Sequence, residues 1–421
     1  MPYELLILLS MLAVFALSVF LLKLPSGVAL VLSAIVGALV GGEGVPLRHL
    51  VEGSFGYLDA ILIIATAMIF MKVLDGSGAL GTLGHLLMQS LYRWPTILFI
   101  FISFFVMFPG MLTGLSSACI LTTGALVAPA MLAMRIPAPA VGSFIAMMAV
   151  YGMIAPPINI PVMIIGGGVD MPYIGFEKPL ALASFPLALI VAMYYRIRYV
   201  RKIQIDEVLS RLPAPLHAKH GLKLFAPLVL VVVLMIAIRV IPQYMPDIGI
   251  PLIFMLGSLV GLVTGERIEF WQTARTAIRE ALPVMVILVG VGMFVQIMTL
   301  TGVRGFLAVG ALNLPPVFLY LGIALLMPAF GSAYASASVL GVPLVYVFLG
   351  KNEIVVTSAL SLIAGIGDLM PPPMLLCAFA AQIVGEKNQF QILKQSIPFI
   401  VLSLIAAIAM IAFADQVVKL Y

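Results

Sequence analysis

Two short proline-containing stretches lie inside apolar runs that are each long enough to cross a bilayer. They read GMIAPPIN at residues 152–159, within the run 140–168, and GDLMPPP at residues 367–373, within the run 354–385. A proline lacks the amide hydrogen and moves the preceding residue out of the helical region, so consecutive prolines predict an opened helix. Opened backbone in hydrocarbon must be buried in protein or line a polar cavity. The stretches therefore predict a midplane binding site, with a proline kink retained for packing as the alternative.

Hydroxyl side chains are concentrated at two glycine-containing turns, at residues 109–117 and 328–336, each expected to face one of these interruptions. Hydroxyl, amide and carboxylate oxygens suit a small cation, and helix N-termini supply positive dipole ends for a substrate carboxylate. The expected ligands are Ser116, Ser117 and Asn159 at the first meeting point, and Ser332, Ser336 and Asp368 at the second. The expected substrate-binding residues are Ser116, Ser117, Asn159, Ser332 and Tyr334. All of them except Tyr334 are also expected cation ligands. Packing of small residues is the alternative explanation, above all for Thr122, Thr123 and Ser338.

Asp368 is the only carboxylate expected deep inside a span, about 14 residues or ~20 Å along its helix from Ile354. An ionisable group at such depth is costly, which predicts a cation ligand or a proton site. The alternative is an aspartate that caps the half-helix after the break. By contrast, Asp59, Lys72 and Asp75 are expected at span ends, where their charges reach the interface. No arginine is expected near the turns, so dipoles, hydroxyls and cations would hold an anionic substrate.

The composition independently indicates a polytopic membrane protein. Of its 421 residues, 63% are hydrophobic and 9% charged, and the mean hydropathy is +1.21, whereas a soluble domain has about a quarter charged residues. The two cysteines show no disulfide or metal spacing. No phosphate-binding loop, nucleophile elbow or zinc motif is present in the sequence, so we expect neither an enzyme nor a cofactor. The net charge of +5 reflects loop placement and indicates no nucleic-acid partner.

The elements that must position these residues follow the same order in both halves of the chain. Each half is expected to hold five spans, one of them broken at a proline stretch, and one re-entrant hairpin. The expected spans are 5–22, 26–40, 58–74, 140–168 and 180–195, then 224–241, 250–264, 282–298, 354–385 and 396–414. The hairpins are 95–134 and 314–349, and residues 78–94 form an interfacial arm. Residues 5–22 have no basic residue before them and predict a retained helix.

Matching spacings predict a duplication. Gly114 and Gly124 are ten residues apart, as are Gly331 and Gly341. The repeats would be residues 1–199 and 224–421, joined by a basic linker at 200–223 that is expected in the cytoplasm. Five spans is an odd number, so the second repeat is expected to be inverted, with both termini outside. The hairpin 95–134 then enters from the cytoplasm and 314–349 from outside. Six of the 22 basic residues lie outside: Arg48, Lys178, Arg239, Arg304, Lys351 and Lys419.

These motifs resemble those of the large membrane subunit of tripartite ATP-independent periplasmic (TRAP) transporters. The resemblance rests on the stretch 152–161 with Gly166, on the stretch from Gly53-Ser54 through Ser77-Gly78, on the serine-rich turn 114–118, and on the second break 367–372. It implies an elevator-type, sodium-coupled importer of small organic acids such as C4-dicarboxylates. It also implies two partners, a small membrane subunit and a periplasmic binding protein, and a bacterial or archaeal inner membrane. Carried over, the family's sodium ligands are Gly114, Ser116, Ser117, Pro157, Asn159, Gly331, Ser332, Gly367 and Pro371.

Two departures from that family keep other interpretations open. The second turn is richer in serine than the family pattern, and three consecutive prolines at the second break are unusual. A stand-alone organic-anion symporter or antiporter of the same ion transporter superfamily would need no partner. A membrane scaffold, in which the proline breaks only shape packing, is the interpretation from a different class.

Overall fold

The computed structural model describes residues 2–200, 205–240, 243–244, 246, 248–312, 314–371 and 373–420. Within these ranges the chain forms helices joined by turns, apart from one isolated bridge between Leu349 and Lys351. Among the described residues, six helices are long and apolar enough to cross a membrane, and a bent pair makes a seventh candidate. The protein is therefore an all-α, multi-pass membrane protein, as the composition predicts.

The first half contains eleven α-helices and two π-helical turns. In order they are α1 (Tyr3–Ala16) with η1 (Leu17–Leu21), α2 (Ser26–Val40), α3 (Leu47–Phe55), α4 (Leu58–Gly76), α5 (Ala79–Leu91), α6 (Pro95–Thr113), α7 (Ser116–Cys119), η2 (Ile120–Gly124), α8 (Ala125–Ala133), α9 (Ala138–Ile154), α10 (Ile160–Gly167) and α11 (Glu177–Tyr199). The linker holds α12 (Ile205–Leu209) and α13 (His217–His220), and residues 201–204 of the expected linker lie outside the described ranges.

The second half repeats this order. It consists of η3 (Gly221–Phe225) with α14 (Ala226–Val240), α15 (Ile250–Thr264), α16 (Phe270–Leu300), α17 (Val303–Leu312), α18 (Pro316–Ala329), α19 (Ala333–Ser336), η4 (Ala337–Gly341), α20 (Val342–Val347), α21 (Glu353–Ile366), η5 (Gly367–Leu369), α22 (Leu375–Val384), α23 (Gln389–Ala412), α24 (Ala414–Val417) and η6 (Val418–Leu420). A π-helical turn follows the tip of each hairpin, in η2 and in η4.

Two of the expected spans begin earlier than the hydropathy pattern predicts. The span predicted at 58–74 is preceded by α3, and α3 and α4 meet at a bend of 42°. The span predicted at 282–298 is the end of the 31-residue helix α16. Asp59, which was expected at a span end, lies in the first turn of α4, directly after this bend. Near the other end of α4, Lys72 Nζ lies 2.8 Å from Glu280 Oε1 on α16.

The helices α1–α4 and α14–α16 form a first bundle with reciprocal packing. Helix α2 packs on α16, and α15 packs on α4. Glycines allow the close approach: a Cβ on Gly27 would lie 2.6 Å from the Val286 backbone, and one on Gly261 would lie 2.5 Å from Val73. A helix from each half of the chain thus packs against a helix of the other half.

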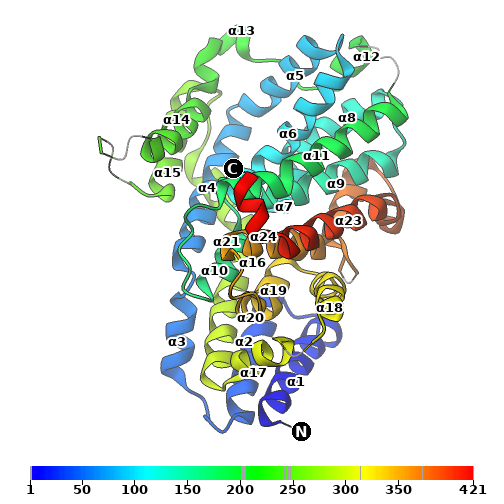
Figure 1. Ribbon diagram of the computed structural model, residues 1–421. Coiled ribbons are helices and arrows are strands. Elements are labelled where there is room, and N and C mark those ends of the chain that lie inside the picture. Colours follow the sequence, from blue (N-terminus) through cyan, green and yellow to red (C-terminus); the bar gives the residue numbers. More distant parts are fainter. Residues whose placement is uncertain are drawn as a thin grey trace.

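A second bundle contains the two hairpins and the two broken helices. Its buried centre is α9 and α21, packed against α6, α11, α22 and α23. In Figure 1, α5 and α6 lie towards the upper end of the molecule, and their counterparts α17 and α18 lie towards the lower end. The N-terminus and the linker helix α13 also lie at opposite ends. The boundaries of the repeats and the sidedness of the membrane remain predictions.

Candidate functional site at the hairpin tips and helix breaks

Each hairpin turns back at a glycine in the left-handed region. Gly114 (φ +68°) ends α6, and Gly331 (φ +64°) follows α18. A side chain at either position would strain the backbone. The returning helices begin immediately afterwards, one at Ser116 and one at Ala333, and each continues through its π-helical turn to form a helix over residues 116–133 and 333–347. Both tips therefore present a helix N-terminus to the interior of the second bundle.

The first break opens the chain between α9 and α10. Ala155 is extended, and the Pro156–Pro157 bond is cis. The amide of Ile158 donates to Met111 O at 3.2 Å, which ties this break to the first hairpin. The carbonyl of Pro157 accepts a 3.0 Å hydrogen bond from the Tyr173 hydroxyl. The predicted opening of the helix at residues 152–159 is present.

Asn159 closes this break as the N-cap of α10. Its Oδ1 accepts from the Val162 amide at 2.9 Å. Its Nδ2 donates to Ile154 O at 2.9 Å and to Ser361 Oγ, on α21, at 3.0 Å. The side chain therefore stabilises the local break and links it to α21.

The second break contains Asp368, within the η5 turn that ends α21. The next helix, α22, begins after Met374 without a side-chain cap. The alternative in which Asp368 caps the half-helix after its own break is therefore wrong. Its carboxylate reaches the two hairpin tips: Ser116 Oγ donates to Oδ2 at 2.8 Å, and the Ala333 amide donates to Oδ1 at 2.8 Å. The first helix turn of the second hairpin is thus capped from across the bundle.

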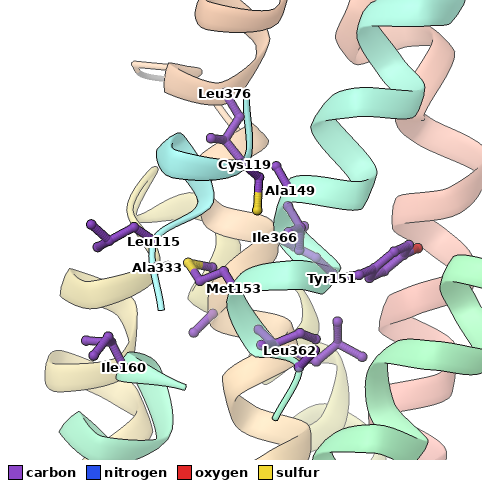
Figure 2. Packing of buried hydrophobic residues seen from close by; sticks show 14 of the residues in the cluster. Leu115, Cys119, Ala149, Tyr151, Met153, Ile160, Ala333, Leu362, Ile366 and Leu376 are labelled. Carbon is purple, nitrogen blue, oxygen red and sulfur yellow. The ribbon is translucent and has the colours of Figure 1, made fainter. Parts of the chain in front are cut away.

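Further contacts close the junction between the tips. The Tyr334 hydroxyl donates to Gly114 O at 3.2 Å, so the second tip also touches the first. Gly367 approaches the backbone of Ser332, where a Cβ would meet atoms at 3.3 Å. A Cβ on Gly114 would lie 2.3 Å from the Ile160 side chain. Leu115, Met153, Ile160 and Ala333 belong to the buried apolar cluster at this place (Figure 2).

One hydroxyl at the junction has no partner among the described residues. Ser336 is fully buried on α19, and its Oγ makes no hydrogen bond within the part of the chain that the structure describes. The hydroxyl of Thr357, on the neighbouring helix α21, is also buried without a hydrogen-bond partner among the described residues. Buried hydroxyls without a protein partner are rare and commonly mark a water or an ion. Ser117, which follows Ser116 on α7, is partly exposed.

The structure brings together one group of the predicted residues and separates others. Those that meet are Gly114, Ser116, Ser332, Tyr334, Gly367 and Asp368, with Gly331 in the same turn. Pro371 is exposed within the second break, between η5 and α22, and Asn159 and Pro157 are bound within the first break. Pro372 lies outside the described residues. Sequence reasoning missed Ser361, although it precedes Asp368 by seven residues, a spacing that places both on one helix face.

The charge at the junction comes from Asp368 and from helix ends. Among the described residues there is no group of three or more His, Cys, Asp or Glu side chains that could hold a metal ion. Arg304 lies instead at the far end of α10, where it donates to Gly168 O and to the Tyr346 hydroxyl. The junction therefore offers one carboxylate, several hydroxyls and two helix N-termini. This set suits a small hard cation beside an anionic group.

No family model matches this sequence, and the search of curated proteins found no relative. The fold is similar to that of a solved structure, the YdaH transporter of Alcanivorax borkumensis, with a TM-score of 0.61. The two chains are 18% identical, and the similarity covers 88% of each. At this identity the comparison shows a shared fold. The resemblance to the TRAP subunit stays a prediction.

Proposed function

We propose that this protein is a secondary active transporter that imports a small organic anion with a cation gradient, and that it works without partner subunits. The observation that carries the proposal is the Asp368 carboxylate, which holds the tips of both hairpins. A ligand at this point touches segments from both halves of the chain at once. The similarity of the fold to a transporter supports the same interpretation. An enzymatic role has no comparable support.

The proposed cation is sodium. Its oxygen ligands would come from the side chains of Asp368, Ser116, Ser117 and Ser336 and from backbone carbonyls of the hairpin tips. An electrical gradient supplies about 2.3 kcal/mol per charge per 100 mV, which drives accumulation without ATP. More than one ion per cycle is expected if the predicted duplication also gives the first break, at Asn159, an ion site of its own.

The proposed substrate is a C4-dicarboxylate or a similar small organic acid. The N-termini at Ser116 and Ala333 point positive dipole ends at the junction, and Asp368 with sodium bound is locally neutral. Transport would occur by movement of the second bundle against the first, as in an elevator. The reciprocal packing within the first bundle supports its role as the fixed part.

The test is uptake of labelled succinate and related acids into vesicles that contain this chain alone. We expect uptake that requires an inward sodium gradient and is lost when the gradient is collapsed. Uptake that appears only when a small membrane subunit and a binding protein are added would favour the tripartite system. Uptake that follows a pH gradient without sodium, and stops in Asp368→Asn, would make Asp368 a proton carrier. No gradient-driven uptake of any organic acid would contradict the proposal.

A further inference from the structure

A cavity of about 510 Å³ lies between the two bundles, apart from the junction at Asp368. Its walls are the bend between α3 and α4, the start of α15, helix α10 and the loop 171–176. Ligand sites in proteins are commonly cavities of 300–1,000 Å³, apolar with a few polar groups. The size and the position between two bundles make this cavity a candidate binding site of its own.

The charge in this cavity is negative. Asp59 is exposed at the bend and lines the cavity, and it has no ion pair or hydrogen bond among the described residues. Of the described residues that line the cavity, none is a lysine, arginine or histidine. Asp59 is the only charged side chain among the described residues of this wall, and its carboxylate attracts a cationic occupant.

Aromatic rings form part of the remaining wall. Tyr57, Tyr173 and Phe176 all line the cavity, and the rings of Tyr173 and Phe176 are stacked with centroids 5.4 Å apart. The face of an aromatic ring attracts a cation, and most effectively one that is weakly hydrated, such as a substituted ammonium. Met163 and Met171 add polarisable apolar surface that can adapt to methyl groups. A bare inorganic cation would gain little from such walls.

We propose that this cavity binds a ligand with a quaternary or protonated ammonium group, with Asp59 as the counter-charge and the tyrosine rings against the ammonium methyl or methylene groups. The ammonium can belong to a water-soluble amine or to a lipid headgroup. This inference does not depend on the transported substrate or the coupling ion.

The cavity is also connected to the first helix break. Tyr57 OH donates to Ile164 O at 2.9 Å, and Tyr173 OH donates to Pro157 O at 3.0 Å. The two tyrosines that line the cavity therefore hold the segment on either side of the start of α10. A ligand that contacts both rings favours the arrangement of the bundles seen here.

The proposal is tested by binding of labelled choline to the purified protein in a non-ionic detergent. We expect saturable binding that 3,3-dimethylbutan-1-ol, the uncharged counterpart of choline, does not displace. Asp59→Asn should weaken choline binding at least tenfold. The matched control is Asp206→Asn, because Asp206 is an exposed aspartate in the first turn of α12 that does not line the cavity.

Three outcomes would overturn the proposal: no saturable choline binding, equal binding in Asp59→Asn, or displacement of choline by equimolar sodium. The two sources of ammonium are separated in lipid nanodiscs. If a headgroup is the occupant, discs of phosphatidylcholine suppress choline binding and discs of phosphatidylglycerol do not. If a soluble amine is the occupant, choline binds equally in both. Because no step of this test measures transport, its failure would leave the proposed function unaffected.

Discussion

The hydroxyl of Ser116 donates a 2.8 Å hydrogen bond to Asp368 Oδ2, although the two residues are 252 positions apart in the chain. The other carboxylate oxygen accepts from the Ala333 amide. One side chain therefore joins the first hairpin tip, the second hairpin tip and the second helix break. Replacing either Ser116 or Asp368 should therefore alter the positions of both hairpin tips.

Asp368→Asn and Ser116→Ala should each weaken the apparent sodium affinity of uptake at least tenfold. The double variant should be little worse than the more severe single variant, because both changes remove the same interaction. Sodium titrations of uptake in vesicles measure all three affinities. Strictly additive losses would show that the two side chains act independently.

Ser336→Ala should lower sodium affinity by about tenfold with little loss of thermal stability, since its hydroxyl makes no hydrogen bond among the described residues. Ser338→Ala is the matched control. Ser338 is equally buried, but its hydroxyl already donates to Ala335 O at 2.9 Å. Its loss should cost about 1 kcal/mol of stability and leave sodium affinity unchanged. The reverse pattern would remove Ser336 from the proposed ion site.

Replacing both Pro156 and Pro157 with alanine should let α9 continue and withdraw the Pro157 carbonyl and the Ile158 amide from their present partners. We expect normal membrane insertion and uptake reduced at least tenfold. Tyr173→Phe removes only the hydroxyl that holds the Pro157 carbonyl, so its effect should be smaller. Wild-type uptake in the proline variant would show that these prolines serve helix packing and not transport.

Membrane sidedness is tested by single cysteines in a variant with Cys119 and Cys377 replaced by alanine. A cysteine at Ser210, in the linker, and one at Lys419, near the C-terminus, should react with an impermeant reagent from opposite sides. This follows from five spans in each half of the chain. Labelling of both from the same side would contradict the inverted repeat.

The linker is held by Glu266, in the loop between α15 and α16. Lys219 Nζ donates to its Oε1 at 2.6 Å, and His220 Nε2 lies 3.1 Å from the same oxygen. The hydrogen bond from Lys219 lowers the pKa of Glu266 below its usual value of 4.5. The ionised Glu266 carboxylate therefore stabilises the docked linker above pH 4.5. This contribution is lost as the pH falls through the lowered pKa and the carboxylate is protonated.

Hydrogen exchange of the linker amides should therefore be slow at pH 7 and, after correction for intrinsic rates, increase in acid. Glu266→Gln should already raise exchange at neutral pH, whereas Glu269→Gln, in the same loop, should not. Equal exchange in the wild type and Glu266→Gln would show that other contacts hold the linker, such as buried Val208 and the hydrogen bond from Leu216 N to Thr82 Oγ1.

The sequence alone determined the class of protein and the position of its interruptions. Composition and run length predict an all-helical membrane protein, because hydrocarbon requires each span to satisfy its own backbone. Consecutive prolines predict the open segments, since they remove amide donors locally. The spans predicted at 26–40 and 250–264 coincide with α2 and α15 for the same reason. Each of these features depends on neighbouring residues only.

Tertiary structure decided which polar groups meet. No local pattern shows that Asp368 binds Ser116 and Ala333, because that contact depends on how two halves of the chain pack. Nor does local sequence show that the side-chain amide of Asn159 is already hydrogen-bonded, by its Oδ1 to the Val162 amide of its own helix and by its Nδ2 to Ser361. The bend at Asp59 escaped detection because α3 is amphipathic and falls below the hydropathy of a span. Spacing places residues on helices, but only the packing of those helices determines which side chains can share a ligand.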